Sequence, residues 1–217
     1  MRHRIWAEFV SQIGPRYADC SFETFVTHGS AAERKQQARV LAALRSYAQS
    51  IRDNLREGRN VVVFGPSGTG KDHLLVSLTR AAREVVSVEG GEARQKFRWA
   101  NGMDVFANLR DVFNAESRTE GGESHKWTSP PLLMLSDPLP PATGGSPGEL
   151  TPFQAAFLLR VIDARYRACR PTFVSISVAG GKEAATRMGS AVLDRLKHDA
   201  LTCWCNWSSF RKASEEV

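Results

Sequence analysis

Short apolar runs alternate along the chain with segments whose apolar residues recur every three to four positions. The strand-like runs are 60–64, 97–100, 131–135, 172–177 and 201–207, of which 131–135 is apolar without interruption. Runs of this length, rich in β-branched and other apolar residues, are typical of strands covered on both faces. Five of them separated by helical segments predict an α/β fold, with a mainly parallel five-stranded sheet flanked by helices on both faces.

Apolar residues at helical spacing fill the segments between these strands. An N-terminal helix is predicted to end at Gly14-Pro15, followed by an extended arm over 16–25 whose aromatic residues anchor it to the core. Further helices are predicted over 31–56, 70–86, 101–114, 152–169 and 184–200. The stretches 115–130 and 138–151, rich in small and turn-forming residues, predict surface loops. We expect residues 1–30 to form an arm with a candidate docking helix, and residues 31–217 to form one domain.

A glycine-rich turn follows the first predicted strand and leads directly into a helical segment. Its sequence, G-x-x-x-x-G-K, is that of a phosphate-binding P-loop in the strand–turn–helix context that this motif requires. Glycines let backbone N–H groups point at phosphate oxygens, and the helix N-terminus attracts negative charge. We predict a nucleoside triphosphate site formed by Gly65, Pro66, Ser67, Gly68, Thr69, Gly70, Lys71, Asp72 and His73.

A nucleotide site of this kind also needs an acidic residue at the end of a buried strand that neighbours the P-loop strand. The run Leu132-Leu133-Met134-Leu135 ends in Ser136-Asp137. A carboxylate at that place can hold the Mg²⁺ shell and orient the attacking water. We therefore predict Asp137 as catalytic and, with Asp72, as part of a Mg²⁺ site; the alternative is that Asp137 caps a turn before Pro138.

The net charge of +6 and a pI near 9.4 suit a polyanionic partner, although the arginines are spread along the chain and predict a diffuse basic face. The four cysteines show no C-x-x-C spacing, which argues against zinc, and Cys203 and Cys205 are expected to be small core residues. No apolar leader follows Met1 and no run is long enough to cross a bilayer. We expect a cytoplasmic protein without membrane association.

Several motifs outside the P-loop narrow the class. They are the strand 132–137 followed by Pro140-Pro141, Arg170-Pro171-Thr172, the stretch 191–196 with Asp-Arg-Leu, and Ser209-Phe210-Arg211. Together with the P-loop, they make the chain from about Arg16 to Arg211 resemble the ATPase domain of DnaC-type helicase loaders and the related IstB-type transposition ATPases, within the AAA+ superfamily. The resemblance implies ATP and Mg²⁺ as cofactors, and Lys71 as the contact to the β- and γ-phosphates.

The resemblance also implies roles for residues that the motifs alone leave open. Ser177 ends the fourth strand at a position where the family has a polar residue that senses the nucleotide. Arg195 matches an arginine offered to a neighbouring subunit's nucleotide, with Arg187 as a second candidate, and Arg211 matches one that senses the γ-phosphate of its own chain. A guanidinium suits these roles because it presents a planar, permanently charged fork to phosphate oxygens. Without the resemblance, Arg195 and Arg211 would be interpreted as solvated surface charges.

Three positions depart from the family pattern. Ser136 stands where the family has its first metal-shell aspartate, Asp72 replaces the usual hydroxyl of the P-loop, and Ser177 is shorter than the usual asparagine. The Asp72 carboxylate could supply the charge that Ser136 lacks. Losing one oriented group can cost on the order of 10²–10³ in rate. We therefore expect firm ATP binding with slow hydrolysis.

The favoured interpretation is an ATP-binding AAA+ protein of DNA replication that self-associates through Arg195 on single- or double-stranded DNA and acts on the replicative helicase. Few residues precede the P-loop, which leaves 1–13 as a candidate docking helix. Three alternatives stay open: an IstB-like ATPase that binds duplex DNA and recruits a transposase, a non-hydrolysing P-loop adaptor or scaffold, and a small-molecule kinase. The kinase is least favoured, because the segment 115–130 has only Arg118 and Lys126 to cover an acceptor.

Overall fold

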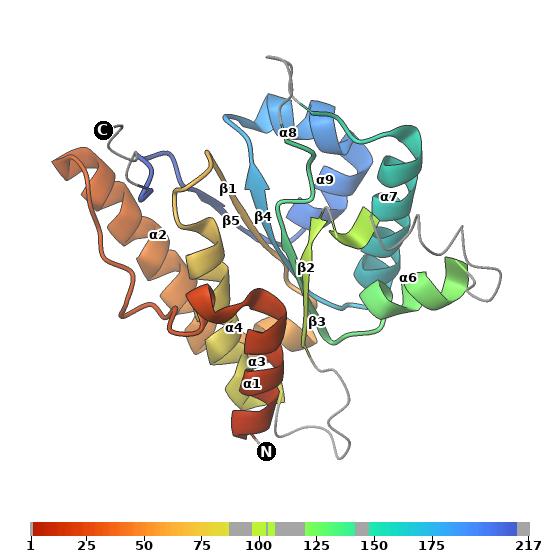
Figure 1. Cartoon of the computed structure of the whole chain (residues 1–217), viewed down its shortest axis with the longest axis horizontal. Helices are drawn as coiled ribbons and strands as arrows, with labels where there is room; N and C mark the ends of the chain where they lie inside the picture. Colours follow the sequence, from red (N-terminus) through yellow and green to blue (C-terminus); the bar gives the residue numbers. More distant parts are fainter. Residues whose placement is uncertain (1, 87–96, 103, 107–119, 142–147, 212–217) are drawn as a thin grey trace.

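Five parallel strands form a sheet in the order β2-β3-β4-β1-β5 (Figure 1). The structure is a computed structural model that describes residues 2–86, 97–102, 104–106, 120–141 and 148–211. The strands are β1 (Val61–Gly65), β2 (Phe97–Asn101), β3 (Leu132–Ser136), β4 (Thr172–Ser177) and β5 (Leu201–Trp204). In register, Val62 of β1 lies between Val174 of β4 and Thr202 of β5. The predicted α/β fold with a five-stranded parallel sheet is confirmed.

Helices cover both faces of this sheet, α1 to α4 on one face and α6 to α9 on the other (Figure 1). Their bounds are α1 (Arg2–Ile13), α2 (Ala31–Gln49), α3 (Ile51–Arg56), α4 (Lys71–Val86), α6 (Glu120–Thr128), α7 (Pro152–Arg167), α8 (Gly181–Met188) and α9 (Ser190–Lys197), with a short 3₁₀ turn, η1 (Pro15–Tyr17). Because all five strands run in the same direction, their carboxyl ends lie at one edge, where α4 and α8 begin.

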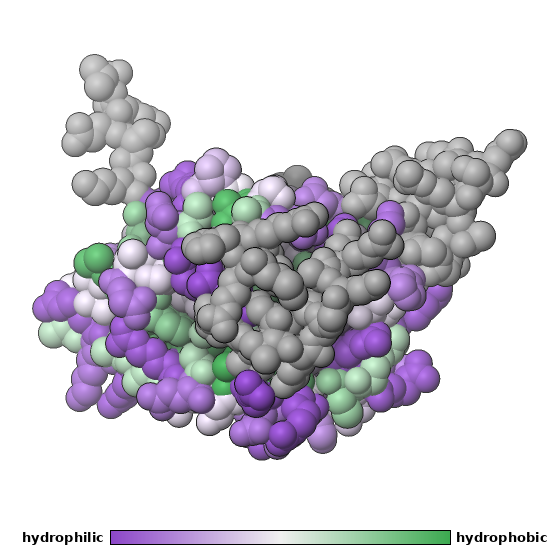
Figure 2. All heavy atoms as spheres, turned by 90° about the horizontal axis from the view of Figure 1, so that it is seen from below, coloured by the Kyte–Doolittle hydropathy of each residue, from purple (hydrophilic) through white to green (hydrophobic). Residues whose placement is uncertain are grey.

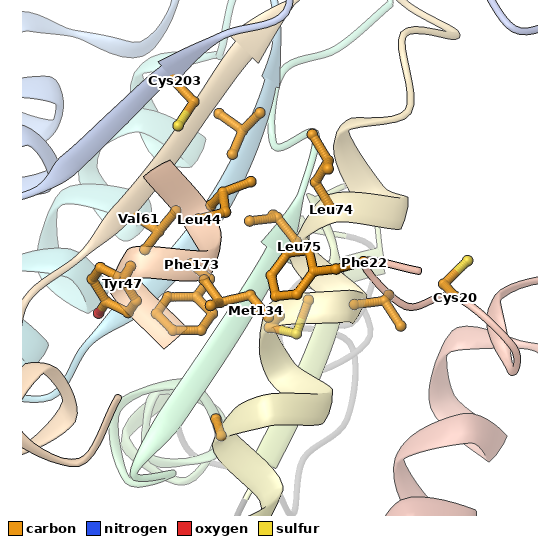
Figure 3. Close-up of a cluster of buried hydrophobic side chains, with 14 of the residues drawn as sticks. Cys20, Phe22, Leu44, Tyr47, Val61, Leu74, Leu75, Met134, Phe173 and Cys203 are labelled. Carbon is orange, nitrogen blue, oxygen red and sulfur yellow. The ribbon is translucent and has the colours of Figure 1, made fainter. Parts of the chain in front are cut away.

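The side chains of strand β1, which lies between β4 and β5, enter two separate clusters of buried apolar side chains. Val61 and Val63 belong to the cluster beneath α2 and α4, whereas Val62 and Phe64 belong to the cluster beneath α7 and α9. Successive side chains of a strand point to opposite faces, so a strand that is apolar throughout fits only between two layers of helices. Figure 3 shows the first cluster, in which Leu44, Tyr47, Leu74, Leu75, Met134 and Phe173 converge.

The cysteines behave as the sequence indicates. Cys203 and Cys205 are buried on the α2 side of the sheet, as expected of small core residues. Burial raises the pKa of the Cys203 thiol to about 11 and raises the pKa of the Cys205 thiol further. Both side chains therefore stay protonated and act as packing groups.

The N-terminal segment packs on the domain. Phe9 of α1 is buried against the rings of Phe97 and Trp99 of β2, and Phe22 and Phe25 of the following arm enter the same core. The predicted anchoring of the arm by aromatic residues is confirmed, although the arm contains η1 and turns and is not fully extended. The predicted docking role of 1–13 stays a prediction.

Two predicted helices are each divided. The segment 31–56 forms α2 and α3 with a break at Ser50, whose φ and ψ of −102° and 26° leave the helical region. The buried Asn54 side-chain amide donates to the Tyr47 carbonyl. In a continuous helix, that carbonyl would accept a bond from a backbone amide instead. The segment 184–200 forms α8 and α9 around Gly189, whose φ of 91° ends the first helix.

The predicted surface loop 115–130 is wrong over 120–128, which forms α6. The glycines and polar residues of this stretch lower its helix propensity, but Trp127 is buried against the second cluster and Arg98 lies over its ring at 4.7 Å. Tertiary packing thus overrides weak local preference. The predicted helix 101–114 falls mainly outside the described residues; 104–106 are helical, with Val105 and Phe106 buried.

The face seen from below is mostly hydrophilic where it is described, with small scattered apolar patches (Figure 2). This pattern matches the spread of arginines along the sequence and gives no single large apolar surface on this face. Among the described helices, none is both long and apolar enough to cross a membrane.

Candidate nucleotide-binding site

The P-loop lies between β1 and α4 and has the backbone that the motif requires. Gly68 and Gly70 have φ values of 83° and 81°, a region that residues with a side chain rarely adopt. A Cβ atom at Gly70 would also meet the Phe25 ring at 2.9 Å. Thr69 Oγ1 donates to the Pro66 carbonyl at 2.9 Å and closes the turn. The glycines are therefore needed for both conformation and space.

Lys71, the first residue of α4, points into the loop. Its Nζ atom donates to the carbonyl oxygens of Gly65 (2.9 Å) and Pro66 (2.8 Å) and to Ser177 Oγ (3.1 Å). These three contacts use all the donors of an ammonium group. Burial lowers the pKa of Lys71, and the nearby carboxylates of Asp137 and Asp72 oppose that shift. The structure thus brings the predicted phosphate-contacting lysine to the predicted sensor position at the end of β4.

Asp72, the second residue of α4, bridges the helix to two strands of the sheet. Ser136 Oγ at the end of β3 donates to Asp72 Oδ2 at 2.9 Å, and Ser175 Oγ of β4 donates to Asp72 Oδ1 at 2.7 Å. Ser136 and Ser175 are buried. The carboxylate that the P-loop carries in place of a hydroxyl therefore lies beside the strand end that has lost its carboxylate.

Asp137 follows β3 in a left-handed backbone conformation with a φ of 45°. Its amide donates to the Ser175 carbonyl at 3.0 Å, and its Oδ1 accepts from the Ser177 amide at 2.9 Å. Aspartate tolerates this conformation better than most residues. These bonds fix the side chain across the ends of β3 and β4 and agree with the turn-capping alternative; the catalytic role of Asp137 stays a prediction.

The segment after β5 passes over the P-loop. Trp207 Nε1 donates to the Thr69 carbonyl at 3.0 Å, and the Phe210 amide donates to the Gly68 carbonyl at 2.9 Å. The Phe210 ring packs edge-on against Phe25 of the N-terminal arm. This segment, residues 205–211, is called the C-terminal strap below. It carries Arg211 to the loop.

These residues enclose a cavity of about 290 Å³. Its lining includes the P-loop residues Ser67, Gly68, Gly70, Lys71, Asp72 and His73, the strand-end residues Asp137, Ser175 and Ser177, and Arg16, Tyr17 and Arg211. Most predicted site residues from three distant parts of the sequence therefore meet at one place. A second cavity of about 560 Å³ shares Ser67, Asp137 and Ser177 with the first.

Three lining residues were not predicted as site residues. Arg16 and Tyr17 lie in the arm, whose aromatic residues were expected only to anchor it to the core. Burial and, secondarily, Asp72 raise the pKa of Tyr17. Ser175 lies inside the predicted strand 172–177. A hydroxyl in an otherwise apolar central strand was the available signal, since a buried polar group needs a partner.

The predicted cofactor residue His73 faces the arm as well as the cavity. Its Nε2 lies 2.9 Å from the Ser21 carbonyl and 3.3 Å from Thr24 Oγ1, and its ring packs edge-on against Phe25. These contacts favour a role in joining the arm to α4. Binding of a nucleotide by His73 stays a prediction.

The two arginines considered for a neighbouring subunit lie away from this cavity's lining. Arg195 on α9 donates from Nε to Asp163 Oδ1 of α7 at 2.7 Å and from Nη1 to the Ala191 carbonyl at 3.1 Å. Arg187 is buried and donates to the carbonyls of Gly148, Ser177 and Pro140, and to Glu183; these bonds tie α8 to the ends of β3 and β4. Arg187 also lines the second cavity. The choice of Arg195 for a role in trans, with Arg187 as the second candidate, stays a prediction.

The donor set of the cavity fits Mg²⁺ bound with a nucleotide. Within the described part of the chain, no group of three or more His, Cys, Asp or Glu side chains could hold a metal. Magnesium usually keeps several waters and takes only one or two carboxylates plus phosphate oxygens. Asp72 and Asp137, which both line the cavity, are carboxylates of that kind.

Solved structures share this fold. The crystal structure of the DnaC helicase loader matches with a TM-score of 0.69 at 19% identity, covering 88% of this chain and 99% of that one. The crystal structure of DnaI matches with a TM-score of 0.60 at 14% identity, covering 91% and 94%. The replication initiator DnaA, bound to AMPPCP and single-stranded DNA, matches with a TM-score of 0.57 at 13% identity, covering 88% and 50%.

At these identities the likeness establishes the fold alone: the chain has the α/β fold seen in the structure of the DnaC helicase loader. The predicted resemblance to that fold is confirmed. No protein-family model matches the sequence, and a comparison with curated protein sequences finds no match.

Proposed function

We propose that this chain binds ATP with Mg²⁺ and acts in DNA replication as an AAA+ protein of the helicase-loader kind. The observation that carries the proposal is the meeting of Lys71, Asp72, Asp137 and Arg211 around one cavity at the carboxyl edge of the sheet. Ligands of open α/β sheets bind at this edge. The fold shared with the DnaC helicase loader supports the choice of replication over other uses of a P-loop.

In the proposed complex, the residues around the cavity each contact the nucleotide or its metal. A bound triphosphate would replace the carbonyl contacts of Lys71 and accept bonds from loop amides and the N-terminus of α4. Arg211, brought to the loop by the C-terminal strap, would approach the γ-phosphate. Asp72 and Asp137 would hold the Mg²⁺ shell, and the metal when bound neutralises the charge of the phosphates.

We propose slow hydrolysis. Asp137 Oδ1 is already engaged by the Ser177 amide, and the Ser177 hydroxyl is engaged by Lys71. A short hydroxyl held by lysine reaches less far toward an attacking water than an asparagine amide would. ATP would then serve as a switch between two states of the protein, with turnover below the ordinary enzyme range of ~1 s⁻¹.

We also propose that the protein self-associates on DNA through Arg195. The helix α9 presents this guanidinium at the surface, about one third exposed, where a second copy could reach it. The basic net charge of +6 supports contact with the phosphate backbone of DNA, whose neutralisation releases counterions. The replicative helicase is the proposed protein partner.

A non-hydrolysing P-loop scaffold is the second candidate, favoured by Ser136 and Asp72, which depart from the hydrolytic pattern. The two functions predict different effects of nucleotide and DNA on the oligomeric state of the protein. A loader assembles when both are present, whereas a scaffold binds nucleotide and stays monomeric.

The test is equilibrium binding of a fluorescent ATP analogue with and without single-stranded DNA, while molecular mass is followed. Lys71→Ala is expected to lower affinity at least about tenfold, because it removes the only P-loop side-chain cation. Arg56→Lys, a change at an exposed arginine of α3 outside the cavity of about 290 Å³, is the control for nonspecific effects. Absence of binding by the wild-type chain, or binding that Lys71→Ala leaves unchanged, would contradict the nucleotide site.

A further inference from the structure

One pair of residues reverses the usual distribution of groups around a P-loop metal. In P-loop proteins the residue after the lysine is a Ser or Thr that places its hydroxyl on Mg²⁺, and an aspartate at the end of a neighbouring strand completes the shell. Here the residue after Lys71 is Asp72, and the strand ends in Ser136. The structure shows the two in direct contact, with Ser136 Oγ donating to Asp72 Oδ2 at 2.9 Å.

Because Asp72 and Ser136 are in contact, their two departures from the usual pattern form a single feature of the site. A hydroxyl and a carboxylate still face each other across the gap between α4 and β3, but each has moved to the other element. One of the two changes alone would leave either two hydroxyls or two carboxylates at this place. A hydrogen-bonded pair with the groups exchanged keeps the number of negative charges beside the cavity unchanged.

We infer that Asp72 is the metal-shell carboxylate of this protein and that Ser136 is the partner that orients it. This inference rests on the proposed ATP site and states which element supplies the charge. In the exchanged arrangement the carboxylate belongs to the P-loop helix itself, on the residue next to Lys71. The metal is then held by the same segment that holds the phosphates.

The bonding of the carboxylate leaves room for a cation. Asp72 Oδ2 accepts from Ser136 and Oδ1 accepts from Ser175 Oγ at 2.7 Å. Each carboxylate oxygen has about two acceptor sites, so these two bonds do not use all the acceptor sites of a carboxylate that lines the cavity. The two buried hydroxyls fix the orientation of the carboxylate, as partners of metal ligands generally do.

The exchange has a consequence for binding that a hydroxyl would not produce. A carboxylate on the P-loop helix lies close to where the phosphates bind and repels them when no cation is present. With Mg²⁺ between them, the same carboxylate attracts the metal–nucleotide complex. Nucleotide affinity should therefore depend more strongly on Mg²⁺ than it does when the P-loop carries a hydroxyl.

The experiment is a double-mutant cycle read out as binding, not hydrolysis. The dissociation constant of a fluorescent ATP analogue is measured in Mg²⁺ and in EDTA for the wild type, Asp72→Thr, Ser136→Asp and the double variant Asp72→Thr/Ser136→Asp. The ratio of the two constants is the metal dependence. Thermal unfolding without nucleotide checks that each variant is folded.

For Asp72→Thr we expect tighter metal-free binding and a metal dependence at least about tenfold weaker, since the repelling and metal-holding charge is gone. Ser136→Asp places two carboxylates in contact and should weaken metal-free binding. The double variant restores one hydroxyl and one carboxylate in the more common arrangement, and its metal dependence should return to within about threefold of the wild type. Such non-additivity is the signature of residues that act as a pair.

Asp72→Asn is the second variant in case Asp72→Thr does not fold, because the amide keeps the size and one acceptor oxygen. Ser77→Ala is the matched control: it removes a buried hydroxyl of the same helix that donates to the His73 carbonyl and does not touch Asp72, and should retain the metal dependence. A wild-type metal dependence in Asp72→Thr or Asp72→Asn, or a double variant that equals the sum of the single changes, overturns the inference while the ATP site stands. Failure of the wild type to bind the analogue with or without Mg²⁺ overturns both.

Discussion

Arg195 Nε lies 2.7 Å from Asp163 Oδ1, so the arginine that we propose to act on a neighbouring subunit is held by α7 of its own chain. The other oxygen of the same carboxylate accepts from Arg167 Nε at 2.9 Å. The hydrogen bond from Arg195 is the main reason that the pKa of Asp163 lies below its usual range. Action in trans therefore requires Arg195 to exchange Asp163 for a phosphate.

This exchange predicts opposite effects for the two partners. Asp163→Asn releases Arg195 and should strengthen nucleotide-dependent self-association about two- to fivefold, the equivalent of the ~0.5–1 kcal/mol that an ion pair near the surface contributes. Arg195→Ala should abolish nucleotide-dependent association. Molecular mass measured against protein concentration, with and without ATP, gives both quantities.

Arg167→Ala is the control, because it removes the second partner of Asp163 and leaves Arg195 in place. If Arg195→Ala and Asp163→Asn both assemble as the wild type does, Arg195 serves only to join α9 to α7.

Asp137→Asn should separate binding from hydrolysis. An amide oxygen can still accept from the Ser177 amide, so the turn after β3 is expected to keep its shape. The loss of negative charge removes the group that orients water, and the hydrolysis rate should fall on the order of 10²-fold. Phosphate release under saturating ATP measures the rate, and analogue binding measures affinity, which should change less than the rate.

A wild-type rate well above ~1 s⁻¹ would contradict the proposed slow hydrolysis. A wild-type rate that Asp137→Asn leaves unchanged would instead show that Asp137 has no part in the reaction.

Trp207→Phe should loosen the P-loop. The change keeps most of the buried ring but removes the Nε1 donor to the Thr69 carbonyl. The expected loss is ~1 kcal/mol in the free energy of unfolding, the usual contribution of one hydrogen bond, together with weaker nucleotide binding. Urea unfolding and analogue titration measure these effects.

Trp204→Phe is the matched control on the neighbouring strand, where the ring stacks on Phe64 at 4.5 Å. It should affect stability through packing but leave nucleotide affinity near the wild-type value. Equal losses of affinity in both variants would argue against a specific contact between the C-terminal strap and the P-loop.

Glu33 should make stability depend on pH in the acid range. Its carboxylate accepts from the amides of Ser30 and Ser208 at 2.7 Å each, and these backbone bonds lower its pKa to about 2. Because the folded-state pKa is below the unfolded value of 4.5, the contribution is complete above pH ~5 and is lost as the pH falls toward 2.

Urea unfolding of the wild type and Glu33→Gln from pH 7 to pH 2 measures this contribution as a difference. The difference should be constant at neutral pH and disappear at the acid end, since the protonated wild type resembles the variant. A difference that does not change with pH would mean that the Glu33 charge contributes nothing. The side chain joins the N-terminus of α2 to the C-terminal strap.

The sequence predicts the parallel sheet and the place of the site at its carboxyl edge. Five strand-like runs and a P-loop leave few alternative arrangements for an α/β fold. It does not predict the break at Ser50, because the apolar spacing from Val40 to Leu55 continues through it. The break depends on the buried contact between Asn54 and Tyr47, which no local pattern contains. Gly189, in contrast, was a readable stop signal inside the predicted helix 184–200.

For the site, the motifs identify most of the lining residues one at a time. They do not predict the contact between Asp72 and Ser136, because it joins a helix start to a strand end that are far apart in sequence. The same holds for Ser175 and for Tyr17, whose positions beside the P-loop follow from sheet register and from the packing of the arm. Spatial pairing is decided by the assembled core and cannot be read from spacing.

The position of β1 in the sheet affects how the chain can fold while it is being synthesised. Val61 pairs with Phe173 on one side and Leu201 on the other, so the strand that carries the P-loop is synthesised long before either neighbour. While it emerges from the ribosome, β1 can form none of these ladders, and Trp207 is not yet there to hold the loop. Non-local pairing of this kind is slow and exposes apolar strands. The pocket that we propose for nucleotide is therefore complete only after translation has passed Arg211, so the proposed ATP binding belongs to the finished protein and not to the nascent one.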